Sequence, residues 1–224
     1  MIARPLLLLT LLVQAGSADE AARAALGRFS ERFRDLGGLS ASFTQSRRTA
    51  LLNEPITSSG KLRYRRDPAR LVFEVEKPRR ASIHFDGKSY QVYRPDEKQL
   101  EQFEVEDSEM ARWLFMAFHP KVEEIGKSFA IKAGSLKEET LEVVLVPSEA
   151  KLLKVLAKLT LVLSRADAPG DPLLRRIGYV DAEQDEVSFE ITDAALNPTL
   201  SPEVFELKLP EGVKVFKHKK KAGP

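Results

Sequence analysis

Short alternating segments between residues 41 and 105 constrain the fold of this chain more than any other feature. In each segment, apolar side chains occupy every second position, which is the period of a strand with one buried face. Turn sequences such as Asp86-Gly87 and Pro95-Asp96 separate the segments. Strands this short and this closely spaced favour an antiparallel meander. The expected strands are Ala41–Arg48, Gly60–Arg65, Leu71–Val75, Ala81–Phe85, Ser89–Tyr93 and Gln99–Val105.

The alternation continues through the second half of the chain. Ser148–Val155 is ambiguous between helix and strand, and we interpret it as a short helix that leads into a strand. Twisted sheets of more than about ten strands rarely stay flat, and about eleven or twelve strands are expected here. We therefore predict a mainly β (α+β) fold, in which one curved antiparallel sheet forms a single domain. The further strands expected are Phe129–Ala133, Leu141–Val146, Leu159–Leu163, Leu173–Val180, Val187–Thr192 and Val204–Leu209.

Two longer helices are expected beside the sheet. The first repeats apolar residues at helical spacing from Leu26 to Leu36 and ends at Gly37-Gly38. The second follows a cap at Asp107 or Ser108 and ends before His119-Pro120. The concave side of a curled sheet is the natural place for both helices to bury their apolar faces.

The first 18 residues read as a secretory signal peptide. Arg4 precedes an apolar run from Leu6 to Val13, and small residues follow up to Ala18. The run is too short to span a bilayer as a helix. We expect export with cleavage near Ala18, a folded domain over residues 19–213, and a basic C-terminal tail over residues 214–224. The tail is expected to fray, and contact with anionic lipid or a negatively charged partner is the alternative.

Composition excludes several classes of protein. The chain of 224 residues has no cysteine, so it can neither form a disulfide nor carry a lipid on an N-terminal cysteine. The formal net charge is +2, and lysines crowd the last eight residues. Once these lysines are set aside, acidic residues slightly outnumber basic ones. We therefore expect no nucleic-acid partner.

No motif points to catalysis or to a bound metal. The three histidines have no cysteine or histidine neighbour at metal-ligand spacing, and His84 is expected to face solvent from a strand. Both Gly-Lys-Ser segments lack the earlier glycine of a phosphate-binding loop. A nucleophile elbow is also absent from the sequence. We expect no enzymatic activity, no metal and no cofactor.

A set of short motifs recurs in a specific order along the chain. The motifs are Leu39–Gln45, Ser59–Pro68, Lys77-Pro78, Asp86–Lys88 with Tyr90–Tyr93, and Phe205-x-Leu207-x-Leu209-Pro210-x-Gly212-Val213. In order and spacing they resemble the bacterial periplasmic outer-membrane lipoprotein carrier (LolA) family. The resemblance covers most of the mature chain, strongly from Leu39 to Leu100 and weakly between Ser108 and Pro172.

The resemblance implies an incomplete antiparallel barrel, lidded by helices over a hydrophobic cavity. It implies a non-enzymatic periplasmic carrier that shields the acyl chains of lipoproteins, taking them from an inner-membrane ABC exporter to an outer-membrane receptor. We expect the carrier to be a monomer. A lipid-sensing regulatory module, or a carrier of another lipid or glycolipid, remain alternatives on the same fold.

Candidate site residues follow from the strand pattern and from the resemblance. Each apolar candidate could equally be ordinary core. In the family, an Arg beside the Pro after the Gly-x-Leu strand holds the lid helices, and Arg66 is the closest match. Asp67 intervenes, so it could form a bulge, or the role could belong to Arg65 or Arg70. The wall candidates are Leu62, Tyr64, Leu71, Phe73 and Val75, and the lid candidates are Met110, Trp113 and Leu114.

Overall fold

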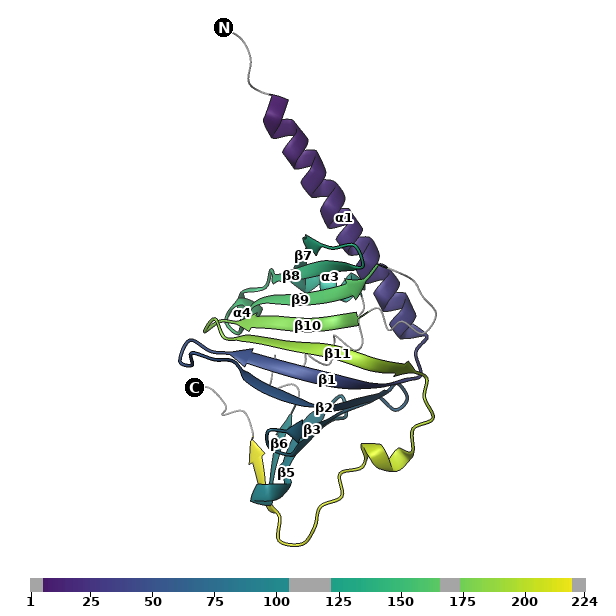
Figure 1. Cartoon of the computed structure of the whole chain (residues 1–224), viewed down its shortest axis with the longest axis vertical. Helices are drawn as coiled ribbons and strands as arrows, with labels where there is room; N and C mark the ends of the chain where they lie inside the picture. The colour runs from purple at the N-terminus through teal and green to yellow at the C-terminus, as the bar shows by residue number, and fades with distance from the viewer. Residues whose placement is uncertain (1–5, 105–121, 166–173, 219–224) are drawn as a thin grey trace.

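The computed structural model describes residues 6–104, 122–165 and 174–218. Helix α1 (Leu6–Arg34) comes first and continues without a break through the expected signal sequence. Figure 1 shows its first part projecting away from the sheet and its last part lying beside it. Among the helices described, none is both long enough and apolar enough to cross a membrane.

The described strands form one open sheet of twelve. Neighbouring strands are antiparallel, except that β12 pairs with β6 in parallel. Figure 1 shows that the sheet curves without closing, which confirms the predicted mainly β fold with a curved antiparallel sheet. The order across the sheet is β12-β6-β5-β4-β3-β2-β1-β11-β10-β9-β8-β7. The strands are β1 (Gly38–Arg48), β2 (Ile56–Arg65), β3 (Arg70–Lys77), β4 (Ala81–Phe85), β5 (Ser89–Arg94), β6 (Gln99–Glu104), β7 (Phe129–Leu136), β8 (Thr140–Pro147), β9 (Leu156–Ser164), β10 (Leu174–Asp181), β11 (Glu186–Leu196) and β12 (Lys214–His218).

Short helical elements complete the described part of the chain. They are α3 (Val122–Ser128), α4 (Ala150–Leu153) and the 3-10 turns η1 (Pro95–Glu97) and η3 (Pro202–Phe205). Helix α4 leads into β9, as predicted for the ambiguous segment Ser148–Val155. The second long helix expected from the sequence lies outside the described residues, and so do Met110, Trp113 and Leu114.

Helix α1 lies on one face of the sheet, which we call the inner face. Its buried side chains, which include Ala22, Leu26 and Phe29, pack over β7, β8 and β9. The opposing strands contribute alternate residues to the same core, such as Ile131 and Val143. Burying these apolar side chains is the main source of stability for a sheet of this kind.

The end of the chain departs from the prediction. Val204–Leu209 was expected to be a strand, but it begins in η3 and then runs without pairing in the sheet. Pro202 starts the 3-10 turn, and Phe205 is buried against the outer face of the sheet at β3. A segment with alternating apolar residues can bury them by packing on a face of the sheet as well as by pairing with an edge strand. The last strand is instead β12, inside the segment expected to be a frayed basic tail.

Candidate functional site

The predicted wall residues lie together on the inner face. In the antiparallel register, Leu62 of β2 is opposite Phe73 of β3, and Tyr64 is opposite Leu71. These four side chains are buried, whereas Val75, two positions beyond Phe73, is only partly buried. The structure therefore brings all five wall candidates to one face of two adjacent strands.

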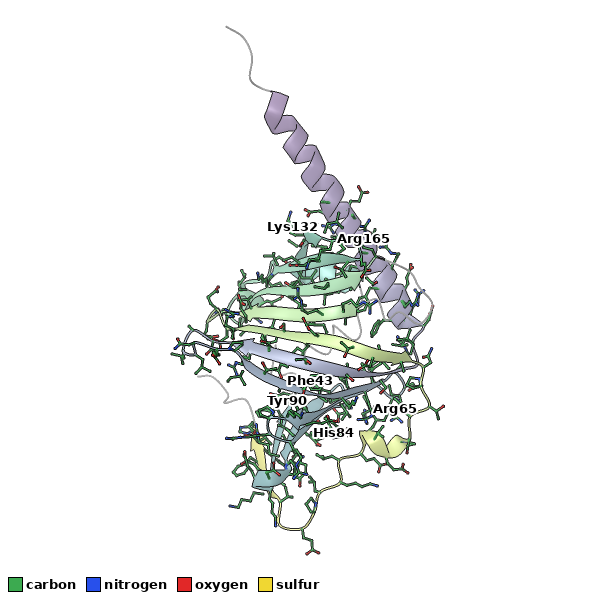
Figure 2. The ribbon with its side chains drawn as sticks, viewed as in Figure 1. Phe43, Arg65, His84, Tyr90, Lys132 and Arg165 are labelled. Atoms are coloured by element: carbon green, nitrogen blue, oxygen red, sulfur yellow. The ribbon has the colours of Figure 1, made fainter. Side chains whose placement is uncertain are left out.

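Aromatic rings continue this apolar surface across five strands. The ring of Phe73 lies 5.4 Å from that of Phe43 and 6.2 Å from that of Phe85, measured between centroids. Phe85 is 5.5 Å from Tyr90, which in turn stacks on Phe103 at 4.5 Å. We call this set, from Phe43 to Phe103, the aromatic row. Figure 2 labels Phe43 and Tyr90, which lie on the lower half of the sheet in that view.

Exposure increases along the aromatic row. Phe43, Phe73 and Phe85 are buried, and Tyr90 and Phe103 are half-buried. The last ring, Phe103, stacks at 4.3 Å on the exposed imidazole of His218 in the edge strand β12. The row thus leads from the core to solvent at one edge of the sheet, so an apolar ligand could enter along it.

Sequence reasoning missed most of the aromatic row. Phe85, Tyr90 and Phe103 stand at inner-face positions of strands that were correctly placed. The signal was available, because Tyr90 is opposite Phe85 and Phe103 is opposite Tyr90 once the strands pair. Extending the inner-face alternation from β3 through β6 would have identified all three.

The other half of the inner face is covered by α1. Phe33 of α1 lies 4.6 Å from Phe29 and 6.4 Å from Tyr64, measured between ring centroids. Burial raises the pKa of the Tyr64 phenol above its usual range, while the nearby Arg66 opposes that shift. In the described residues, no cluster of three or more histidine or acidic side chains could hold a metal ion.

Arg66 joins the β2–β3 turn to the end of α1. Its Nε donates a hydrogen bond to the carbonyl oxygen of Leu36 at 2.7 Å, and its backbone N–H donates to Gly37 at 2.9 Å. Leu36 follows the last turn of α1, where carbonyl groups lack partners within the helix. Asp67 lies in the turn rather than in a strand bulge, because β2 ends at Arg65 and β3 begins at Arg70.

The two alternative arginines point elsewhere. The guanidinium of Arg65 lies 4.7 Å above the ring of Phe205 on the outer face. Arg70 donates to the carbonyl oxygen of Ala69 at 2.9 Å and to that of Asp86 at 3.3 Å. Arg66 is therefore the arginine of the three whose side chain is hydrogen-bonded to the end of α1 in the described residues.

The sequence predicted that His84 faces solvent, but in the structure it is partly covered. It lies on the outer face of β4, opposite Val72 and close to Phe205 of η3, and is half-buried; Figure 2 labels it. Its Nε2 is 2.7 Å from Ser82 Oγ, and burial lowers its pKa. The expectation was wrong because the segment around Phe205 covers a face that the strand pattern alone would leave open.

Comparisons with known proteins place this chain in a family. The outer membrane lipoprotein carrier protein LolA family matches residues 34–208. No curated protein matches the sequence. Among solved structures, an uncharacterized conserved protein from Thermus thermophilus is 11% identical with a TM-score of 0.54, covering 88% of this chain and 99% of that chain.

Two further structures resemble this chain at the same low identity. MucB is 11% identical with a TM-score of 0.53, covering 84% of this chain and 63% of MucB. A LolA superfamily protein from Nitrosomonas europaea is 11% identical with a TM-score of 0.47, covering 83% of this chain and 97% of that chain. Such identities show the fold alone. The family match over most of the chain, on an open curved sheet, shows that this chain belongs to the outer membrane lipoprotein carrier protein LolA family.

Proposed function

We propose that this chain is a periplasmic carrier that shields the acyl chains of lipoproteins between the inner and outer membranes. One observation carries the proposal: the aromatic row leads from buried Phe73 to half-buried Phe103 on the inner face. Such a surface offers contiguous apolar contact, so it suits a hydrocarbon chain better than a polar substrate. The matching family of lipoprotein carriers supports the same cargo.

The free energy of hydration explains why such a carrier is needed. Each buried CH₂ group contributes about 0.8 kcal/mol, so a sixteen-carbon chain left in water forfeits on the order of 12 kcal/mol. A protein that covers the chain removes most of this penalty during the crossing. The cargo must then be released, so the apolar surface should pack loosely against the acyl chains.

Arg66 is placed to regulate that release. Its bond to Leu36 ties the β2–β3 turn to α1, which already covers part of the inner face. In this proposal Arg66 is the lid latch, and the wall is formed by Leu62, Tyr64, Leu71, Phe73 and Val75. Met110, Trp113 and Leu114 complete the proposed lid. The partners are acylated lipoproteins, an inner-membrane ABC exporter and an outer-membrane receptor, and the carrier acts as a monomer.

Export requires that residues 1–18 act as a removable signal sequence. Contacts of α1 with the sheet support a boundary near Ala18, because the Asp19 carboxylate accepts hydrogen bonds from Ala133 N and Lys132 Nζ, each at 2.9 Å. We expect the exported protein to begin at Asp19 or within a residue or two of it. Intact-mass measurement of the periplasmic fraction checks this, and a cytosolic form that retains Met1 would contradict it.

A transfer assay tests carriage against the alternatives. The chain is loaded with a triacylated lipopeptide and mixed with phospholipid vesicles, and lipopeptide is measured in both fractions. If the chain is a carrier, the lipopeptide should enter the vesicles faster from the loaded protein than from a control that contains lipopeptide without protein or detergent. Loading followed by retention would favour a lipid sensor, and loading by a glycolipid instead of the lipopeptide would favour another cargo. Failure to load any acylated compound would contradict the proposal.

A further inference from the structure

A groove of about 290 Å³ crosses the outer face of the sheet, on the side away from the aromatic row. Strand register explains its shape. Ser46 of β1, Ser188 of β11, Gly178 of β10 and Thr160 of β9 stand opposite one another in a single cross-strand line. Because these four residues are small, the line forms a floor between longer side chains on both sides. We call this feature the outer groove.

Charged side chains form the two walls of the outer groove. On one side of the floor, the neighbouring cross-strand line contains Arg48, Glu186 and Lys158. On the other side, the neighbouring line contains Arg176. In the described part of the chain, no hydrogen bond or ion pair engages the side chains of the three cations. Within those residues, the groove therefore presents cations that have no internal partner.

Besides Glu186, the outer groove has one other lining carboxylate, Glu142, at the end of the groove near the edge strand β7. Glu142 lines the outer groove from β8, but its side chain lies over Gly134 of the edge strand β7. A Cβ built on Gly134 would lie 2.7 Å from Glu142 Cγ, so the two residues are in close contact. Among the lining residues, three cations stand against two carboxylates, and Glu190, which is opposite Arg176 in the register, lies outside the lining.

Gly178 gives an independent reason to expect a ligand here. Glycine in a strand interior weakens the strand, and it often marks a place where another backbone approaches closely. Packing does not require it, because a Cβ at Gly178 would meet Val187 O at 3.5 Å and Ser188 Cβ at 3.8 Å. Its backbone φ is also not in the left-handed region. The missing side chain instead leaves the groove floor at the level of the backbone.

From these observations we infer that the outer groove binds an extended, acidic segment of a partner protein. Four strands spaced about 4.8 Å apart give the floor a length of about 14 Å, which matches four or five extended residues. Serine and threonine hydroxyls can both donate to and accept from a peptide backbone. The wall cations can meet carboxylates that alternate along the segment. The site does not rest on the proposed cargo, because the outer groove and the aromatic row lie on opposite faces.

Binding of a designed peptide tests this inference. The probe is a fluorescein-labelled ten-residue peptide of alternating Asp and Ser, and the matched peptide alternates Lys and Ser. Fluorescence anisotropy is measured with the full chain and with three variants, Gly178→Gln, Arg176→Ala and Thr44→Gln. Gly178→Gln fills the groove without changing charge. Thr44→Gln places the same glutamine side chain on the outer face of β1, outside the groove lining.

The acidic peptide should saturate the wild-type chain at submillimolar concentration. Gly178→Gln should abolish saturable binding, Arg176→Ala should weaken it about tenfold, and Thr44→Gln should leave it unchanged. Circular dichroism and binding of the acylated lipopeptide verify that each variant is folded, so a failed lipid proposal remains distinguishable. The inference is overturned if the acidic peptide shows no saturable binding. It is also overturned if Gly178→Gln binds normally, since attraction would then be diffuse, or if the Lys-Ser peptide binds equally well.

Discussion

Arg66 ties together two parts of the molecule that are 30 residues apart in sequence, through its bond to Leu36. A guanidinium presents five donors in a rigid fork, which suits the partnerless carbonyls at a helix end. Hydrogen bonds from charged groups contribute about 1.5–3 kcal/mol. Loss of that bond should therefore change the equilibrium between the closed, empty protein and the open, loaded protein. The equilibrium constant should shift roughly ten- to a hundredfold toward the loaded protein.

We therefore predict that Arg66→Leu folds and accepts lipopeptide but releases it poorly to vesicles. The transfer assay above measures the effect, with Arg65→Leu and Arg70→Leu as controls that remove the neighbouring guanidinium groups. Those two variants should transfer normally, because Arg65 packs on Phe205 and Arg70 bonds to Ala69 and Asp86. Normal transfer by Arg66→Leu would show that this bond is structural only.

Gly60 shows a second constraint at the scale of one residue. The β2–β3 register shifts between Ser59 and Gly60, and a Cβ at Gly60 would lie 1.8 Å from the carbonyl oxygen of Glu74. Gly60→Ala should therefore lower the free energy of unfolding by at least about 2 kcal/mol. Gly27→Ala in α1 is the matched control, because no atom beyond its own helix backbone and chain neighbours lies within 4 Å of its Cβ.

The control should raise the unfolding free energy by about 0.5–1 kcal/mol, since alanine favours helix over glycine. Urea denaturation of both variants checks the pair. Equal stability of Gly60→Ala and wild type would mean that the strands separate at this point more easily than the close approach suggests.

At the scale of elements, α1 is attached to the edge strand β7 through Asp19. The backbone N–H of Ala133, and next the side chain of Lys132, hold the pKa of the Asp19 carboxyl below its usual value of 3.8. A carboxyl with a lower pKa in the folded state stabilises that state when ionised. The contribution is complete above the unfolded pKa of about 3.8, and it is lost as the pH falls through the lower folded value.

The attachment should therefore weaken in acid. We expect the amide ¹⁵N–¹H signal of Ala133 to titrate with a midpoint below 3.8, the usual pKa of Asp19. Asp19→Asn should remove that titration, whereas it should persist in the neighbouring variant Glu20→Gln. A midpoint at or above 3.8 in wild type would contradict the bond to Ala133.

The sequence predicted elements well where the signal is local, and poorly where tertiary packing decides. Alternation within each strand identified β1 to β6, and pairing then placed Leu62 opposite Phe73. Local alternation could not predict the path of the chain after β11. Whether Phe205 joins an edge or covers the outer face depends on β3 and Arg65, which lie far earlier in the chain.

The candidate site shows the same division. The sequence placed the wall residues on β2 and β3, because the alternation of apolar side chains gives the buried face directly. The aromatic row was missed because it emerges only when the inner-face alternation is extended across the paired strands β3 to β6. Arg66 came from the family resemblance, and no property of residues 65–70 taken alone separates it from Arg65 or Arg70.

At the scale of the whole molecule, the two faces of one sheet have different proposed functions. The inner face carries α1 and the aromatic row, and the outer face carries the segment around Phe205 and the outer groove. A curved open sheet can serve both tasks because side chains alternate between its faces. Changes on one face should therefore leave the function of the other intact.

Binding of an acylated probe to the inner face tests the central claim most directly. Titration of the chain with a triacylated lipopeptide can be followed through Trp113, the single tryptophan of the sequence. Isothermal calorimetry provides a direct second measurement, and the unacylated peptide is the control ligand. Two variants complete the design: Phe103→Arg in the half-exposed part of the aromatic row, and Thr44→Arg on the outer face.

We predict saturable binding by wild type and by Thr44→Arg, and binding at least about tenfold weaker by Phe103→Arg, since a charge then replaces buried apolar contact. The unacylated peptide should not bind. Absence of binding to folded wild-type protein by both methods, or equal affinity of Phe103→Arg and Thr44→Arg, would contradict an acyl-binding role for the inner face.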